Sequence, residues 1–126
     1  MIQTKRVYEA LTPEDGACFL VERLWPRGIR KTDLKIEGWC RDIAPSTELR
    51  KWFGHDPAKW AEFKSRYRGE LSQRPETWEP LLAAARSGTV TLLYSARDTE
   101  HNSARVLKDF LEERSRDRTV RTSHTR

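Results

Sequence analysis

The sequence has 126 residues, of which 37% are hydrophobic and 34% are charged, and its net charge is +5. This length fits one domain, and no apolar run approaches the ~20 residues that a membrane-spanning helix needs. Residues 1–6 lack the apolar stretch of a secretory signal, so we expect a cytoplasmic protein without membrane contact, in which Cys18 and Cys40 are reduced.

The N-terminal third carries strand and turn signals. Residues 2–8 predict a strand, and residues 11–16, with a proline, an aspartate and a glycine, predict a turn. Residues 18–24 predict a second, mostly apolar strand, which the following Trp-Pro-Arg-Gly sequence ends. A basic, irregular connection over 29–38 follows, and residues 39–44 predict a short edge strand or an extended segment.

Three helices are predicted in the middle of the chain. Ser46 is a good N-cap for the first helix, and Gly54 a good residue to end it. The second begins at Pro57, in the favoured first helical position, and carries aromatic residues at helical spacing. The third covers 77–87, and we expect Pro80 in its first turn, because further inside it would remove a hydrogen bond.

The clearest strand is residues 89–94, whose unbroken apolar and β-branched run is typical of a strand covered on both faces. A loop over 95–99 and a last helix over 100–113 are predicted to follow. Strands separated by helices predict an α/β fold, in which a small parallel or mixed β-sheet is flanked by helices in a single compact domain.

The positive charge is concentrated at the C-terminus. Residues 114–126 contain five arginines and one acid, Asp117, so this segment carries +4 and the other 113 residues carry +1. Its one large apolar residue is Val120, so it cannot bury a face. We predict an α/β domain over 1–113 and a basic, disordered tail over 114–126. A nucleic-acid-binding arm is the alternative interpretation of the tail.

One candidate binding segment is residues 23–31, which follow an apolar strand. Domains of the α/β class usually bind ligands at the C-terminal ends of their strands. Arg23 and Arg27 are candidates to bind a phosphate or carboxylate with paired hydrogen bonds, and Trp25 to stack on an organic portion. Alternatively, Arg23 pairs with a carboxylate of the fold and Arg27 is solvated, as we expect for the other cations of this segment.

The second candidate segment is residues 95–102, where a buried strand runs into a helix. A helix N-terminus presents free backbone N–H groups and the positive end of a dipole. Ser95 stands where the strand stops and Asn102 in the first turn, so both are predicted to orient a ligand. The alternative is that Asn102 satisfies a loop carbonyl, and Asp98 or its neighbour is favoured as a cap. His101 can act as acid or base, although a solvated histidine is more common here.

No metal site or cofactor is predicted. His55, His101 and His124 form no ligand pattern, and Cys18 and Cys40 form no CxxC pair. None of the motifs GxGxxG, P-loop, HExxH or GxSxG occurs. The sequence therefore identifies no cofactor and no evident nucleophile, and it leaves open whether the protein is an enzyme.

Three stretches have a distinctive order along the chain: RLWPRG (23–28) with KTDL (31–34), PSTELR (45–50), and LLYSA (92–96) with Asn102. Together they resemble the YeaO-like branch of the domain-of-unknown-function family 488. The resemblance spans most of residues 2–113. It implies a compact α/β fold and a bacterial or archaeal cytosolic protein, and it implies no established activity, substrate or cofactor.

One departure from the wider family concerns the start of the last helix. More distant members carry a Cys-His-Arg triplet there, where this chain has Asn102, Ser103 and Ala104. The resemblance therefore implies that this chain does not use a thiol-dependent reaction.

These observations favour a site for a small anionic ligand. Its predicted ligand-binding residues are Arg23, Trp25, Arg27, Ser95 and Asn102, and the prediction requires that two segments far apart in the sequence meet at one cavity. Two alternatives stay open. One is nucleic-acid binding through the tail and residues 27–35, and the other is a non-catalytic partner-binding module that uses exposed tryptophans.

Overall fold

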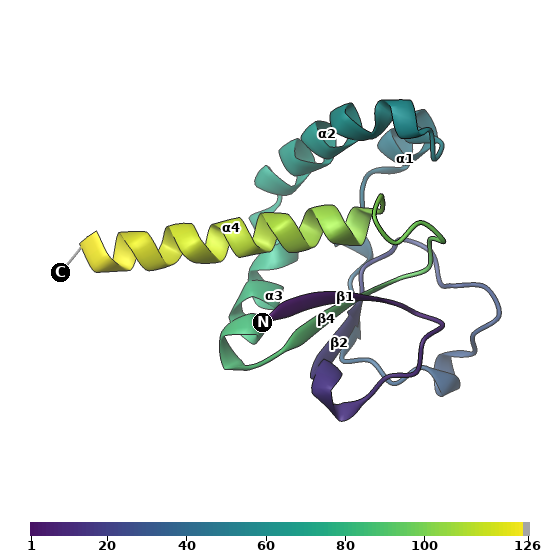
Figure 1. Ribbon diagram of the computed structural model, residues 1–126, viewed down its shortest axis with the longest axis horizontal. Helices are drawn as coiled ribbons and strands as arrows, with labels where there is room; N and C mark the ends of the chain where they lie inside the picture. Colours follow the sequence, from purple (N-terminus) through teal and green to yellow (C-terminus); the bar gives the residue numbers. More distant parts are fainter. Residues whose placement is uncertain (125–126) are drawn as a thin grey trace.

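The computed structural model describes the backbone of residues 1–124 and the side chains of residues 1–116. Its centre is a four-stranded sheet (Figure 1). The spatial order is β1-β4-β2-β3, and all three pairings are parallel. The predicted α/β class is confirmed. Of the two predicted sheet types, parallel and mixed, the sheet is parallel. The strands are β1 (Ile2–Arg6), β2 (Ala17–Leu20), β3 (Gly38–Trp39) and β4 (Val90–Tyr94).

Helices cover one face of this sheet. α4 contacts β1 and β4, α3 contacts β4, and α2 packs against the other three α-helices. Short 3₁₀ turns at Pro13–Asp15, Lys31–Asp33, Arg41–Ile43 and Pro57–Lys59 complete the connections. The α-helices of the described chain are α1 (Thr47–Phe53), α2 (Trp60–Ser72), α3 (Pro75–Ser87) and α4 (Ser103–His124).

The side chains of β4 alternate between two apolar layers, because successive strand residues point to opposite faces. Val90, Leu92 and Tyr94 pack in the layer under the helices. Leu93 packs in a second layer, which the irregular segment 25–39 covers in place of a helix. All five residues of β4 are therefore buried, as the sequence predicts.

Capping explains where α1 begins and ends. Ser46 Oγ accepts a hydrogen bond from Leu49 N at 3.1 Å, and Gly54 ends the helix with φ 53°. Ser46 also donates through its backbone N–H and its hydroxyl to the Glu70 carboxylate, at 2.9 and 2.6 Å. Both capping predictions are confirmed. The start of α1 is thus tied to α2, which fixes how α1 lies against the end of the sheet.

The first two strands are shorter than predicted. β1 ends at Arg6 and β2 at Leu20, because beyond them only one more residue of each strand bonds to β4. Val7 N donates to Tyr94 O at 2.7 Å and Val21 N to Leu93 O at 3.2 Å. The extended segment predicted over 39–44 is the two-residue β3 followed by a 3₁₀ turn.

The prediction for Pro80 is wrong. α3 begins at Pro75, two residues before the predicted start, and so places Pro80 inside the helix. The reason is that Pro75 itself takes the favoured first helical position. Pro80 is on the exposed side of the helix, where its missing N–H is tolerated at the cost of one helical hydrogen bond.

The last helix also differs from prediction. α4 begins at Ser103 rather than at residue 100, and its backbone continues to His124, across residues that were predicted to be disordered. Arg114 holds the start of this extension to the body, because its guanidinium lies 5.6 Å from the Trp78 ring of α3 and donates to Ser72 Oγ of α2. Residues 125 and 126 lie outside the described residues. The division of the chain after residue 113 stays a prediction.

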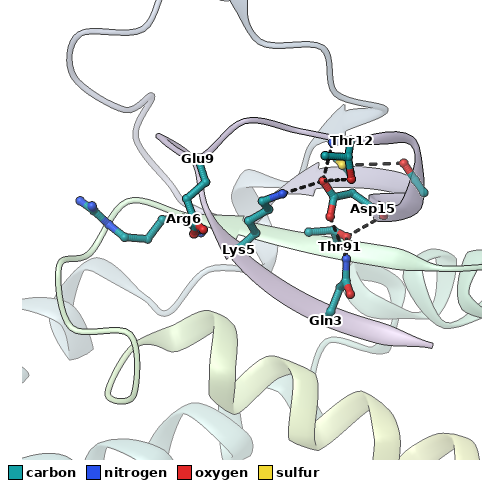
Figure 2. Close-up of polar contacts among 9 residues, drawn as sticks. Gln3, Lys5, Arg6, Glu9, Thr12, Asp15 and Thr91 are labelled. Atoms are coloured by element: carbon teal, nitrogen blue, oxygen red, sulfur yellow. Dashed lines mark hydrogen bonds and ion pairs between the residues drawn. The ribbon is translucent and has the colours of Figure 1, made fainter.

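A closed polar network ties the turn before β2 to β1 and β4 (Figure 2). The carboxylate of Asp15, which is buried, accepts hydrogen bonds from Lys5 Nζ (2.9 Å) and Gln3 Nε2 (3.0 Å). It also accepts from Thr12 N at 2.7 Å. Thr91 Oγ1 accepts from Gln3 Nε2 (2.9 Å) and donates to Asp15 O (2.6 Å). Lys5 and then the Thr12 N–H hold the pKa of Asp15 below its usual value.

The same turn approaches β4 too closely for a side chain at Gly16. This residue has φ 64°, and a Cβ built on it would lie 2.2 Å from Thr89 O. Ala17 N bonds to that same carbonyl at 3.0 Å. Glycine is therefore required where the chain enters β2.

The burial of cysteines and tryptophans concerns two expectations, namely that both cysteines are reduced and that exposed tryptophans could contact a partner. Cys18 is buried, Cys40 is half-buried, both are free thiols, and burial raises the pKa of each. Trp78 is buried and the other four tryptophans are partly exposed. No helix in the described part of the chain is both long and apolar enough to cross a membrane.

Candidate functional site

A cleft of ≈ 600 Å³ lies at the end of the sheet where β1, β2 and β4 stop. The segments that follow these three strands form its walls together with α1 and the beginning of α4. All five side chains predicted to bind a ligand line it: Arg23, Trp25, Arg27, Ser95 and Asn102. The structure therefore brings the two predicted segments together. That these residues bind a ligand stays a prediction.

Arg23 forms no ion pair with a described side chain, so the alternative that it pairs with a carboxylate of the fold is wrong. Its Nη2 donates instead to Ala44 O at 3.4 Å and to Pro45 O at 3.5 Å. Its Nε–H is buried and has no hydrogen-bond partner. The guanidinium is held by carbonyl oxygens that orient it, and it has no ion-pair partner among the described side chains.

Trp25 is held by the turn that it begins. Its Nε1–H donates to Ile29 O at 2.6 Å, and its ring meets Trp39 edge-on with centroids 5.3 Å apart. The ring therefore packs into the second apolar layer as well as lining the cleft. Arg27 is exposed, and its backbone carbonyl accepts a 3.0 Å hydrogen bond from Tyr8 Oη, which pins this loop to the end of β1.

Asn102 satisfies a loop carbonyl, which was the alternative interpretation of this position, and it also caps α4. It is buried, its Oδ1 accepts from Arg105 N (3.0 Å), and its Nδ2 donates to Asp98 O (2.9 Å). Ser95 is partly exposed, and its backbone carbonyl accepts from Arg6 Nη2 at 3.2 Å. Asn102 therefore shapes the cleft through the helix that it caps, while the Ser95 hydroxyl is free to orient a ligand.

Asp98 organises the turn before α4. Its Oδ1 accepts from the backbone N–H groups of Glu100 and His101 at 2.9 and 3.0 Å, and these bonds lower the pKa of Asp98. Its Oδ2 lies 3.0 Å from His101 Nδ1. The His101 ring also meets Trp60 edge-on, with centroids 5.1 Å apart. Asp98 thus caps the turn before α4 and not the helix itself, whose first turn is capped by Asn102, so the favoured prediction of Asp98 or its neighbour as the helix N-cap is wrong. His101 is oriented at the rim of the cleft.

Sequence reasoning missed the contribution of α1 and of the turn after it. Arg50, Lys51 and His55 line the cleft, yet they were not predicted as ligand-binding residues, although Arg50 ends the PSTELR stretch that carries the family resemblance together with the two predicted segments. The available signal was that the two adjacent cations occupy exposed positions of a helix whose other face is apolar. The predicted helix alone did not indicate that its C-terminal turn would lie beside Arg23.

The charge balance of the cleft is strongly positive. Its lining includes four permanent cations, Arg23, Arg27, Arg50 and Lys51, and one carboxylate, Glu22. None of these five forms an ion pair with another described side chain, a property that the four cations share with most other cations of the described chain. No three His, Cys, Asp or Glu side chains among the described residues are grouped to hold a metal ion. The arrangement suits an anion.

Comparison with known proteins identifies the family. Residues 1–125 match the family described as the inactive DUF488-N3 subclade. The chain belongs to this family. It is 47% identical to the uncharacterised protein YeaO of Escherichia coli (strain K12) over 110 residues, which are 87% of this chain and 96% of YeaO. It is 42% identical over 110 residues to the uncharacterised proteins Rv3073c of Mycobacterium tuberculosis and Mb3100c of Mycobacterium bovis, covering 87% of this chain and 92% of each. No solved structure matches the chain.

Membership of this subclade confirms the predicted YeaO-like resemblance. The description of the subclade as inactive agrees with what stands at the start of α4, where Asn102, Ser103 and Ala104 offer no thiol. Asn102 caps the helix and Ala104 is completely buried. These positions therefore serve the packing of α4, and the polar groups that face the cleft come largely from other elements.

Proposed function

We propose that this protein binds a small organic anion in the cleft at the end of the sheet and does not convert it chemically. The observation that carries the proposal is that four permanent cations, Arg23, Arg27, Arg50 and Lys51, line one cleft without ion-pair partners among the described side chains. Clustered like charges repel, so such a group is costly to maintain unless an anion joins it.

The size and composition of the cleft favour a small molecule. Its volume of ≈ 600 Å³ lies in the range of small-molecule pockets, roughly 300–1,000 Å³. Apolar side chains such as Phe53, Phe63 and Pro26 line it beside the cations. A ligand with both an anionic group and an organic portion would therefore use both kinds of surface, as ligand sites commonly do.

Binding without conversion is supported by the family and by the lining. The subclade is described as inactive, and neither cysteine of the chain lines the cleft. His101 is oriented by Asp98 at 3.0 Å, but the structure gives no hydrogen bond between it and Ser95 or Ser103. A serine nucleophile would need such a bond to a base, so the proposal includes no reaction.

Calorimetric titration of the purified protein with citrate, pyrophosphate and glucose 6-phosphate tests the proposal. At least one should bind, and Arg50→Gln combined with Lys51→Gln should weaken it by about 10-fold or more, because charged hydrogen bonds contribute roughly 1.5–3 kcal/mol each. Lys35→Gln combined with Arg86→Gln is the matched control. It removes the same net charge from exposed positions outside the cleft. Equal losses in both variants, or no binding of any anion, would refute the proposal.

A further inference from the structure

Arg23 differs from the other three cations of the cleft in having a buried donor without an acceptor. A guanidinium has five N–H donors in a rigid plane, and those of Arg23 make two long hydrogen bonds through Nη2, while Nε–H makes none. Nearly all buried hydrogen-bond donors in proteins have an acceptor, because leaving one unpaired costs free energy. A ligand acceptor atom within hydrogen-bonding distance of Nε would satisfy this unpaired donor.

The surroundings of Arg23 strengthen its attraction for an oxyanion. The guanidinium lies against the carbonyls of residues 44 and 45, directly before α1. Tyr67, a completely buried side chain whose hydroxyl donates to Ile43 O at 2.7 Å, is close enough for the charges of Glu70 and, less strongly, of Arg23 to act on it. A charge beside such a poorly solvated group is screened less than one at the surface, so its interaction with an anion is stronger.

The rim of the cleft is apolar and exposed. The described chain has three exposed large hydrophobic residues, Met1, Tyr8 and Leu24, and two of them, Tyr8 (48% exposed) and Leu24 (64%), line this cleft. The Tyr8 ring is fixed in place by its hydroxyl, which donates to Arg27 O at 3.0 Å, and by the Arg6 guanidinium 5.0 Å from the ring centroid. Exposed apolar side chains that gather at a concave site favour an apolar ligand group.

We infer that the ligand is an aromatic oxyanion, whose anionic group accepts a hydrogen bond from Arg23 Nε and whose ring lies at the rim against Tyr8 and Leu24. This inference rests on the proposed function and specifies the ligand class for the same cleft. Arg27, Arg50 and Lys51 then supply the remaining positive charge around the anionic group. An aromatic phosphate and an aromatic carboxylate share this chemistry, and the choice between them is left to the experiment.

Titration of the full chain with three pairs of probes separates the ring from the anion. The pairs are phenyl phosphate and inorganic phosphate, benzoate and acetate, and phenyl phosphate and phenol. Phenyl phosphate, benzoate or both should bind about 10-fold tighter than the partner without a ring, because the rim removes apolar surface from water. Tyr8→Ala should reduce this preference, whereas Tyr8→Phe, which keeps the ring and loses only its hydrogen bond to Arg27 O, should reduce it less.

The arginine Nε–H resonances in a ¹⁵N–¹H spectrum report on Arg23 directly in the unmodified protein. The Arg23 signal, assigned by its loss in Arg23→Lys, should shift when phenyl phosphate binds, and that of Arg30, which is 83% exposed and pairs with Asp33 outside the cleft, should not. A bound anion that leaves the Arg23 signal unmoved, as expected if a water is the acceptor for Nε–H, would overturn the assignment of Arg23 Nε as a donor to the anionic group.

Equal affinity for phosphate and phenyl phosphate, and for acetate and benzoate, would overturn the aromatic class of the ligand while leaving anion binding intact. No binding of any probe, together with none in the previous titration, would remove the proposed function itself.

Discussion

Two polar regions on the same small sheet manage their charges in opposite ways. Around Asp15, the charged and amide side chains bond to one another within the protein, and the carboxylate itself is buried (Figure 2). In the cleft at the other end of the strands, four cations and Glu22 form no ion pairs within the described part of the chain. The comparison indicates that the first region contributes mainly to stability, whereas the charges of the second have no ion-pair partner within the described chain, as the proposed anion binding requires.

The largest expected effect is on the closed network. Asp15→Ala should lower the free energy of unfolding by about 2 kcal/mol, because it removes a buried acceptor and leaves the partly buried donors of Thr12, Gln3 and Lys5 without a partner. Urea unfolding followed by tryptophan fluorescence measures the change. Asp33→Ala is the matched control. Its ion pair with Arg30 has the same 2.9 Å length but lies on the surface, so its removal should change stability little.

The second-largest effect is expected from acid, which should reduce the contribution of the same network to stability. Lys5 holds the pKa of Asp15 below its usual value, so the folded protein binds this proton less tightly than the unfolded chain, whose aspartate pKa is about 3.9. The contribution of Asp15 is therefore complete well above about pH 4 and is lost as the pH falls through its lower, folded pKa. The stability difference between the natural chain and Asp15→Asn should shrink over this range. A difference that is constant from neutral pH down to pH 3 would contradict the role assigned to the carboxylate.

Removing cations from the cleft should affect stability far less. In Arg50→Gln combined with Lys51→Gln, less repulsion among the cations opposes the lost interaction with the C-terminal end of α1. We expect a net change within about 0.5 kcal/mol in the same urea titration. A loss as large as that of Asp15→Ala would mean that these cations are structural, and the distinction between the two regions would disappear.

The smallest effect is expected from shortening α4. Deleting residues 117–126 keeps Arg114 against Phe110 and Trp78 and should leave both stability and anion affinity nearly unchanged, because the cleft lies at the opposite end of α4. The same variant tests the alternative of nucleic-acid binding. Binding through the tail would fall steeply with salt and be lost on deletion. Salt-sensitive binding of DNA or RNA by the natural chain that the deletion abolishes would restore that alternative.

Much of the fold could be predicted because its signals are local. The unbroken apolar run of β4 indicated a strand covered on both faces, and Ser46 and Gly54 marked the limits of α1. The errors arose where long-range contacts decide. β2 ends at Leu20 because its hydrogen bonding to β4 stops one residue later. α4 extends beyond residue 113, where Arg114 packs against the rings of Trp78 in α3 and Phe110 in α4.

The candidate site was predicted in part for a physical reason. Parallel strands end at one edge of a sheet, so segments that follow two such strands, like those of Arg23 and Ser95, are expected near one another. The contribution of Arg50 and Lys51 depends instead on how α1 packs, which the sequence pattern of that helix does not contain. The partners of Arg23 illustrate the same limit, because they are backbone carbonyls, and carbonyls have no sequence signature.

The strand order has a consequence for the way this protein is made. β1 and β2 do not pair with each other, and β4, which lies between them, is the last strand to leave the ribosome. A nascent chain that has not yet reached residue 90 therefore holds two strands whose β4-facing edges have no partner, and long-range pairing of this kind forms late. The cleft can consequently assemble only after β4 has been made, so a message truncated before β4 yields a substrate for proteases rather than a partly folded cleft.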